Sequence, residues 1–141
     1  MHCSGRYLSG MIPVPDPDDL LSVADALARR GAKGFLLSGG LDRDGRVPLS
    51  RHIEAVREIK TSTDLLINAH IGLARKSDMS GLVDAGVDAF SVDIYGSNET
   101  ISEVLGLGAR VEDYLDVVRA LMDAGAPNVT PHVCVGIHGG K

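Results

Sequence analysis

Three apolar segments of the sequence carry polar side chains at alternate positions. These side chains are Asn68 and His70 in residues 65–70, Ser91 and Asp93 in residues 89–94, and Thr130 and His132 in residues 129–135. Alternate side chains of a β-strand point to the same face, so each polar set is expected to lie on one side of a sheet. A carboxylate among imidazoles can transfer protons or bind polar ligand groups. His70, Asp93 and His132 are therefore candidate catalytic residues and Asn68 a candidate ligand-binding residue, although an isolated strand histidine is commonly a structural, hydrogen-bonded residue.

Two glycine-containing segments follow apolar segments of the same kind. Ser38-Gly39-Gly40 follows one of them, and Gly136-Ile137-His138-Gly139-Gly140 follows another. Glycines let a ligand approach the backbone and its N–H groups, which bind carboxylates and phosphates. Ser38, Gly39, Gly40 and Gly136 are therefore candidate cofactor-binding residues. A simple tight turn is an equally good explanation of Ser38-Gly39-Gly40 taken alone.

A repeated unit indicates how these segments are positioned. Three times the sequence shows a helical pattern that ends in glycine and is followed directly by a short apolar segment, at Gly31, Gly86 and Gly125. Glycine suits the left-handed residue that follows a helix, because it has no Cβ to clash there. The repeat predicts helices connected to strands by turns of two or three residues.

The hydrophobic pattern predicts four helices alternating with four strands. The helices are expected at residues 17–30, 50–61, 77–85 and 111–124, and the strands at 34–38, 65–70, 89–94 and 129–135. This alternation indicates a parallel sheet with right-handed crossovers. The apolar strand faces, at Leu65 and Ile67, Phe90 and Val92, and Val133 and Val135, are expected to meet the helices.

One polar and one apolar strand face favour a barrel lumen over an open doubly wound sheet, whose strands would be apolar on both faces. The predicted fold is α/β: a partial (β/α) barrel of TIM-like type, with about four β/α units and parallel strands. Four strands cannot close such a barrel. We therefore expect residues 1–141 to form one partial barrel domain, truncated at both ends.

The composition narrows the class of protein. The chain is 44% hydrophobic and 23% charged, with a formal net charge of −5, which argues against a nucleic-acid partner. It contains no apolar stretch of membrane-spanning length and no leader peptide pattern, so we expect a cytoplasmic protein without membrane association. The two cysteines, Cys3 and Cys134, are far apart, and no structural disulfide is expected.

The segments with candidate chemistry resemble a known family. The strongest similarity lies in residues 3–8, 34–45, 87–93 and 131–140. They resemble the radical S-adenosylmethionine (SAM) superfamily, and within it the biotin-synthase homologs that look like two-component lipoyl synthases. The resemblance implies that Cys3 is the last cysteine of a C-x3-C-x2-C motif that binds a [4Fe–4S] cluster. It also implies that Ser38-Gly39-Gly40 contacts the SAM amino group and that the segment containing Gly136 supports the adenine.

The resemblance further implies an enzyme that reductively cleaves SAM to a 5′-deoxyadenosyl radical. The subgroup it resembles implies sulfur insertion into a small-molecule or lipoyl- or biotin-type substrate. A second radical SAM subunit is a candidate partner. The first two cluster cysteines would precede Met1, so the 141 residues alone are expected to be inactive. Two alternatives remain: a cluster-free barrel enzyme of aldolase or phosphate-binding type, and a non-catalytic half-barrel.

Overall fold

A single four-stranded parallel sheet organises the chain. The computed structural model describes residues 10–140. Its strands lie side by side in the order β1, β2, β3, β4, which is also their order in the sequence. Their bounds are Gly34–Leu37 for β1, Leu66–His70 for β2, Ala89–Tyr95 for β3 and Val129–Cys134 for β4. A parallel sheet in sequential order with a helix in each connection confirms the predicted α/β fold of partial-barrel type.

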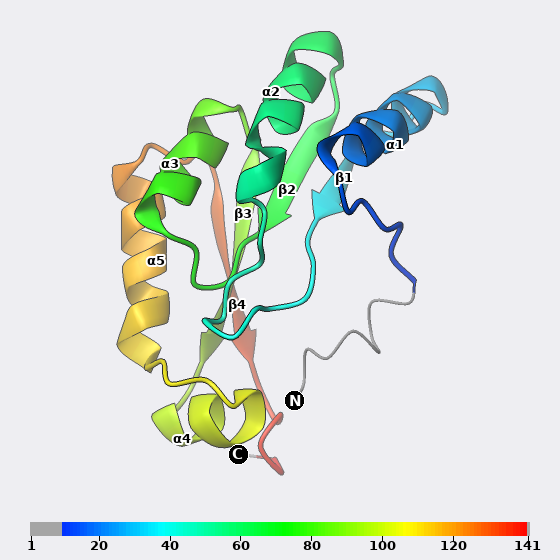
Figure 1. Cartoon of the computed structure of the whole chain (residues 1–141). Helices are drawn as coiled ribbons and strands as arrows, with labels where there is room; N and C mark the ends of the chain where they lie inside the picture. The colour runs from blue at the N-terminus through cyan, green and yellow to red at the C-terminus, as the bar shows by residue number, and fades with distance from the viewer. Residues whose placement is uncertain (1–9, 141) are drawn as a thin grey trace.

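The helices occupy the predicted connections. They are α1 (Pro17–Arg29), α2 (Ile53–Ser62, preceded by the 3-10 turn η2 at Ser50–His52), α3 (Lys76–Asp84) and α5 (Val111–Asp123). Figure 1 shows these helices along one side of the sheet. None of the helices in the described part of the chain is long and apolar enough to cross a membrane.

Local sequence signals set the ends of these helices. Pro17 occupies the first position of α1, where its missing N–H costs nothing, and the backbone N–H of Asp16 donates to the Asp19 carboxylate at 3.3 Å. Gly31, Gly86 and Gly125 have φ values of 75°, 95° and 79°. The left-handed glycine predicted after each helix is therefore confirmed in all three copies of the repeat.

The main hydrophobic core lies between the helices and one face of the sheet. Ile67 and Ala69 of β2 and Phe90 and Val92 of β3 are fully buried there. Leu65 is also buried, while Leu66 is 58% exposed on the opposite face, as strand alternation requires. The prediction that these apolar sets face the helices is confirmed for β2 and β3.

The same prediction is wrong for β4. Val133 and Val135 are 72% and 82% exposed. Val133 is the register partner of Ile94 and so lies on the helix side of the sheet, but α5 packs mainly against β3. Since β4 is the last strand, no helix in residues 10–140 covers its outer edge.

A short helical segment between β3 and α5 was not predicted. Helix α4 (Asn98–Thr100) continues into the π-helix η3 (Ile101–Leu105) beyond the carboxyl ends of the strands (Figure 1). Ile101 is buried with Tyr95, Leu107 and Tyr114 in a second small core. The rings of Tyr95 and Tyr114 meet edge to face, with centroids 5.0 Å apart. This second core fastens the α4–η3 segment to the end of β3.

Candidate functional site

The polar face of the sheet brings together side chains from strands β2, β3 and β4. In the sheet register His70 pairs with Ser91, and Asp93 pairs with His132. These residues stand near the carboxyl ends of the strands, where parallel β/α folds place their ligand sites. The structure therefore joins the three candidate catalytic residues, which are distant in sequence, into one cluster.

Asp93 lies between the two histidines. His70 Nε2 is 3.3 Å from Asp93 Oδ2, and His132 Nδ1 is 3.8 Å from Asp93 Oδ1. The two imidazole rings are 6.4 Å apart, centre to centre. Although His70 Nε2 is buried, it has no partner with hydrogen-bond geometry. The contact with Asp93 becomes an ion pair when the His70 ring is protonated.

Two further hydroxyl groups extend the cluster. Ser38, directly after β1, places its Oγ 3.3 Å from His70 Nδ1. The Tyr95 hydroxyl donates to Asp93 Oδ2 at 3.4 Å. Tyr95 was not among the predicted site residues because the third strand was expected to end at residue 94. Extending the strand alternation two residues beyond Asp93 would have found it.

The electrostatics of the cluster favour an ionised carboxylate. Partial burial alone would raise the pKa of Asp93, because a charged group loses its hydration. The hydrogen-bonding contact with His70, the electrostatic influence of the His70 and His132 rings, and the Tyr95 hydroxyl outweigh this effect and lower the pKa of Asp93 below its usual value. Asp93 is thus an acceptor of hydrogen bonds at neutral pH.

Asn68 lies on the same face, one step further into the sheet. Its Oδ1 accepts a hydrogen bond from Ser91 Oγ at 3.1 Å, and Ser91 is buried. This contact joins β2 to β3 beneath the histidine cluster. Asn68 therefore helps to hold β2 and β3 together below the histidines. Its contact with a cofactor stays a prediction.

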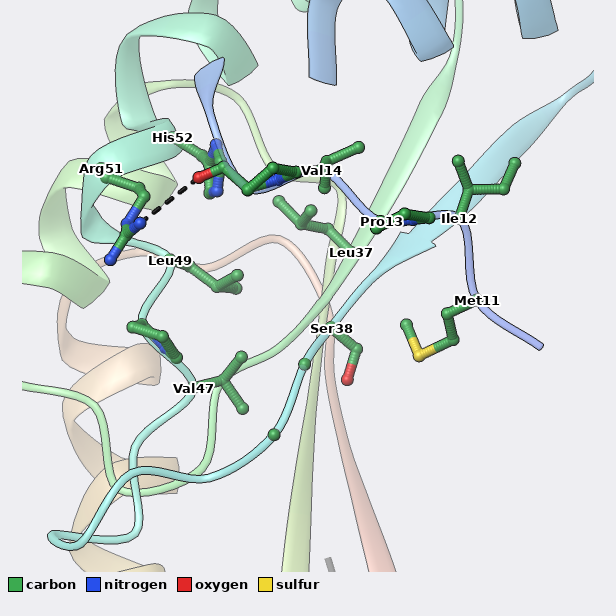
Figure 2. A pocket seen from close by; sticks show the side chains of 14 residues that line it. Met11, Ile12, Pro13, Val14, Leu37, Ser38, Val47, Leu49, Arg51 and His52 are labelled. Atoms are coloured by element: carbon green, nitrogen blue, oxygen red, sulfur yellow. Dashed lines mark hydrogen bonds between the residues drawn. The ribbon is translucent and has the colours of Figure 1, made fainter. Parts of the chain in front are cut away.

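Ser38, Gly39 and Gly40 line a cavity of about 400 Å³ between β1 and the chain that precedes α1. Figure 2 shows Ser38 between Met11 and Ile12 on one side and Val47 and Leu49 on the other. Arg51 donates from Nη1 to the Pro15 carbonyl oxygen at 3.3 Å and so ties the two walls together (Figure 2). A Cβ on Gly39 would lie 3.3 Å from Val47 Cγ1, so a larger residue would crowd this wall.

Gly136 does not line this cavity. It follows β4 with a φ of 76°, at the same edge of the sheet as Ser38 but separated from β1 by β2 and β3. The two predicted glycine segments therefore stand at opposite ends of the row of strands. The His70–Asp93–His132 cluster occupies the positions between them.

The predicted metal ligand, Cys3, lies outside the described residues. Within residues 10–140 no group of three or more His, Cys, Asp or Glu side chains has an arrangement that could hold a metal ion. That part of the chain contains one thiol, Cys134, whereas an iron–sulfur cluster requires several thiolate ligands. The described residues alone therefore do not fit a cluster.

Comparisons with known proteins agree with this arrangement. The family model of the radical SAM superfamily matches residues 1–141. Among solved structures, the fold is similar to HydG, a maturase of the [FeFe]-hydrogenase, with a TM-score of 0.66 and 14% identity over 94% of this chain and 31% of HydG. It is also similar to an uncharacterized protein, with a TM-score of 0.53 and 11% identity over 89% of this chain and 40% of the other. No curated protein matches the sequence.

The similarity to solved structures shows the fold of the chain, and the match to the family model shows the protein family to which it belongs. The chain spans about a third of the length of HydG. The family match extends over the whole sequence, including Cys3, Ser38-Gly39-Gly40 and the segment from Gly136 to Gly140. The chain therefore belongs to the radical SAM superfamily.

Proposed function

We propose that this chain is the SAM-binding part of an enzyme that reductively cleaves SAM, with Cys3 as one ligand of a [4Fe–4S] cluster. The cluster, when bound, supplies the electron that breaks the sulfonium bond. The observation that carries the proposal is the polar layer in which Asp93 lies between His70 and His132. His70 links this layer to the cavity at Ser38-Gly39-Gly40 through its contact with Ser38.

Each described residue has a distinct part in this proposal. The cavity at Ser38, Gly39 and Gly40 receives the amino acid end of SAM, where backbone groups and the Ser38 hydroxyl meet its polar atoms. The ionised Asp93 accepts hydrogen bonds from ribose hydroxyls or from polar substrate groups. Ser38 orients the His70 ring, and His70 holds the carboxylate of Asp93 in place.

Sulfur insertion is the finer part of the proposal. The likeness of residues 3–8, 34–45, 87–93 and 131–140 to two-component lipoyl synthases supports a lipoyl- or biotin-type substrate, and a second radical SAM subunit as partner. The cytoplasm is the compartment proposed for this reaction. The measurement is the mass of a lipoyl- or biotin-type precursor after turnover, which rises by sulfur in place of hydrogen if the assignment holds.

The decisive experiment measures SAM cleavage. The full-length protein is reconstituted anaerobically with iron and sulfide and then reduced in the presence of SAM. We expect broad charge-transfer absorption and the release of methionine and 5′-deoxyadenosine in equal amounts. The matched control is Cys3→Ala, which removes one thiolate and should abolish both signals. A wild-type protein that holds the cluster but releases no 5′-deoxyadenosine would contradict the proposal.

A further inference from the structure

The glycines of the turn after β4 are not held in place by close packing. Gly136, Gly139 and Gly140 have φ values of 76°, 61° and 93°, and no heavy atom lies within 4 Å of where a Cβ would stand on any of them. All three are exposed. Glycines of this kind leave the backbone free to adopt many conformations. The position of this turn must therefore be set by the residues between the glycines.

Two side chains attach the turn to the rest of the molecule. Ile137 packs against the second core, formed by Tyr95, Ile101, Leu107 and Tyr114. His138 makes polar contacts through both ring nitrogens: Nδ1 is 3.3 Å from Thr100 Oγ1, and Nε2 is 3.2 Å from Glu103 Oε2. Thr100 and Glu103 both belong to the α4–η3 segment. His138 therefore bridges the turn to that segment.

The hydrogen bonds around Thr100 are compatible with more than one proton arrangement. Ser97 Oγ accepts from the Thr100 backbone N–H at 3.2 Å and lies 3.1 Å from Thr100 Oγ1. If Ser97 donates to Thr100, the Thr100 hydroxyl is left to donate to His138 Nδ1, and His138 Nε2 faces the Glu103 carboxylate at 3.2 Å. All contacts are then satisfied without a net charge on the imidazole.

The α4–η3 segment, which His138 contacts, is held firmly in the fold. Thr100 is 7% exposed and Ile101 is fully buried, so the α4–η3 segment is held by the second core. The segment includes a π-helical turn, a rare geometry that is frequent at functional sites. A rigid segment that contacts the glycine turn through His138, and through the second core that Ile137 joins, can transmit its position to the backbone of the turn.

We infer that His138 is a positioning residue: it fixes the Gly136–Gly140 turn against the α4–η3 segment so that the turn presents a preformed backbone surface to the nucleotide end of the ligand. The inference rests on the proposed function for the identity of that ligand, SAM. His138 does not itself contact SAM in this assignment, because both of its ring nitrogens are engaged with Thr100 and Glu103.

The first test measures the order of the turn and needs neither cluster nor SAM. The protein is labelled with ¹⁵N-glycine, and backbone order parameters are compared between wild type and His138→Phe, which keeps an aromatic ring but loses both polar contacts. We expect the values at Gly139 and Gly140 to fall below about 0.6, the range of flexible backbone, with Gly86 unchanged as an internal reference. Unchanged values at Gly139 and Gly140 would overturn the inference.

Glu103→Ala removes the partner of His138 Nε2 and leaves the sequence of the turn unchanged. It should loosen Gly139 and Gly140 less than His138→Phe does, since Thr100 still contacts the ring. The matched control is Glu112→Ala: the side chains of Glu103 and Glu112 are both 66% exposed and each contacts a basic group, but Glu112 is paired with Arg110. If Glu112→Ala loosened the turn as much as Glu103→Ala, the specific role of the His138 contact would be disproved.

The second test measures the consequence for SAM in the reconstituted enzyme. A preformed surface lowers the entropic cost of binding, so its loss should raise the KM for SAM about tenfold in His138→Phe and leave kcat within about twofold. His138→Gln, whose amide can still donate to Glu103, should recover most of the affinity. A fall in kcat with unchanged KM would overturn the positioning role. If wild type does not cleave SAM at all, the proposed function fails, while the order parameters still decide whether His138 holds the turn.

Discussion

His70 of β2 and Asp93 of the neighbouring strand β3 lie on the same face of the sheet, with Nε2 of the imidazole 3.3 Å from Oδ2 of the carboxylate. Ser38 contacts the other nitrogen of the same ring, at 3.3 Å. A residue of the predicted SAM cavity is thereby linked to the centre of the polar layer. Replacing Ser38, His70 or Asp93 should therefore affect the other two side chains, and the consequences can be measured.

Removing the charge of Asp93 should change how stability depends on pH. Because the pKa of Asp93 is lowered in the folded protein, the unfolded chain takes up the proton first as the pH falls. The stabilisation is complete above the ordinary carboxyl pKa, and it is lost as the pH falls through the lowered pKa of Asp93. Asp93→Asn should cost about 1 kcal/mol at neutral pH and little in acid.

The measurement is the free energy of unfolding in urea between pH 7 and pH 3 for wild type and Asp93→Asn. Asp116→Asn is the control, because Asp116 forms an exposed pair with Arg119. If wild type and Asp93→Asn lose stability in parallel on acidification, Asp93 is not held ionised by its neighbours.

His52 should make the fold sensitive to mild acid. It is 5% exposed, and its buried Nδ1 has no hydrogen-bond partner. Burial first, and then the charge of Arg51, lower the pKa of His52, against an opposite effect of Asp16. As the pH falls below the ordinary histidine value, the unfolded chain is protonated before the folded one, so stability decreases until the lowered pKa is passed.

His52→Leu should therefore be close to neutral at pH 7.5, within about 1 kcal/mol, and should lose less stability than wild type at pH 5. Urea unfolding at the two pH values measures both effects. Arg51→Gln should weaken the pH dependence in part, because it removes one of its two causes. An equal loss of stability in wild type and His52→Leu would show that other groups produce the acid sensitivity.

Asp88 should be important for stability at the end of the sheet opposite the site. Its carboxylate accepts from Lys60 Nζ at 2.8 and 3.0 Å and from the backbone N–H of Ile67 at 2.7 Å. Lys60 and Asp88 side chains are only 20% and 31% exposed, so solvent screens the pair weakly. Asp88→Ala should lower the free energy of unfolding by about 2–3 kcal/mol, the usual cost of removing hydrogen bonds to charged groups.

The matched control for Asp88 is Asp25→Ala on α1. Asp25 pairs with Arg29 at 2.6 Å, but these side chains are 59% and 71% exposed. Such surface pairs contribute little, so the change should stay within about 1 kcal/mol. Chemical denaturation of both variants is the measurement, and similar losses for the two would show that position in the fold does not matter.

Gly34 should tolerate no side chain. It begins β1, and a Cβ added there would overlap the carbonyl oxygen of Leu66 on β2. The contact is between two backbones that are paired in the sheet, so neither can move without breaking the register. Gly34→Ala should cost about 3 kcal/mol or more.

Gly108→Ala is the control for Gly34, since no heavy atom lies within 4 Å of its Cβ position. Its unfolding midpoint should stay close to that of wild type. A wild-type-like midpoint for Gly34→Ala as well would mean that β1 and β2 are less closely paired than the structure shows.

The sequence alone determined the properties that depend on neighbouring residues. Strand alternation placed Asn68 with His70 and Ser91 with Asp93 on one face, because successive side chains of an extended backbone must point to opposite sides. The left-handed glycines, such as Gly86, were predictable for a similar reason, since a helix end requires a conformation that only glycine adopts without cost. The parallel sheet followed from the alternation of helices and strands.

The tertiary structure decided what depends on distant residues. The 3.3 Å contact of His70 with Asp93 requires the register between β2 and β3, which packing sets. Val133 has the pattern of a buried residue but is exposed, because burial requires a covering helix and not only an apolar side chain. The contact of His138 with Glu103 joins the turn after β4 to a π-helical turn before α5, and only the folded chain brings two such separated segments together.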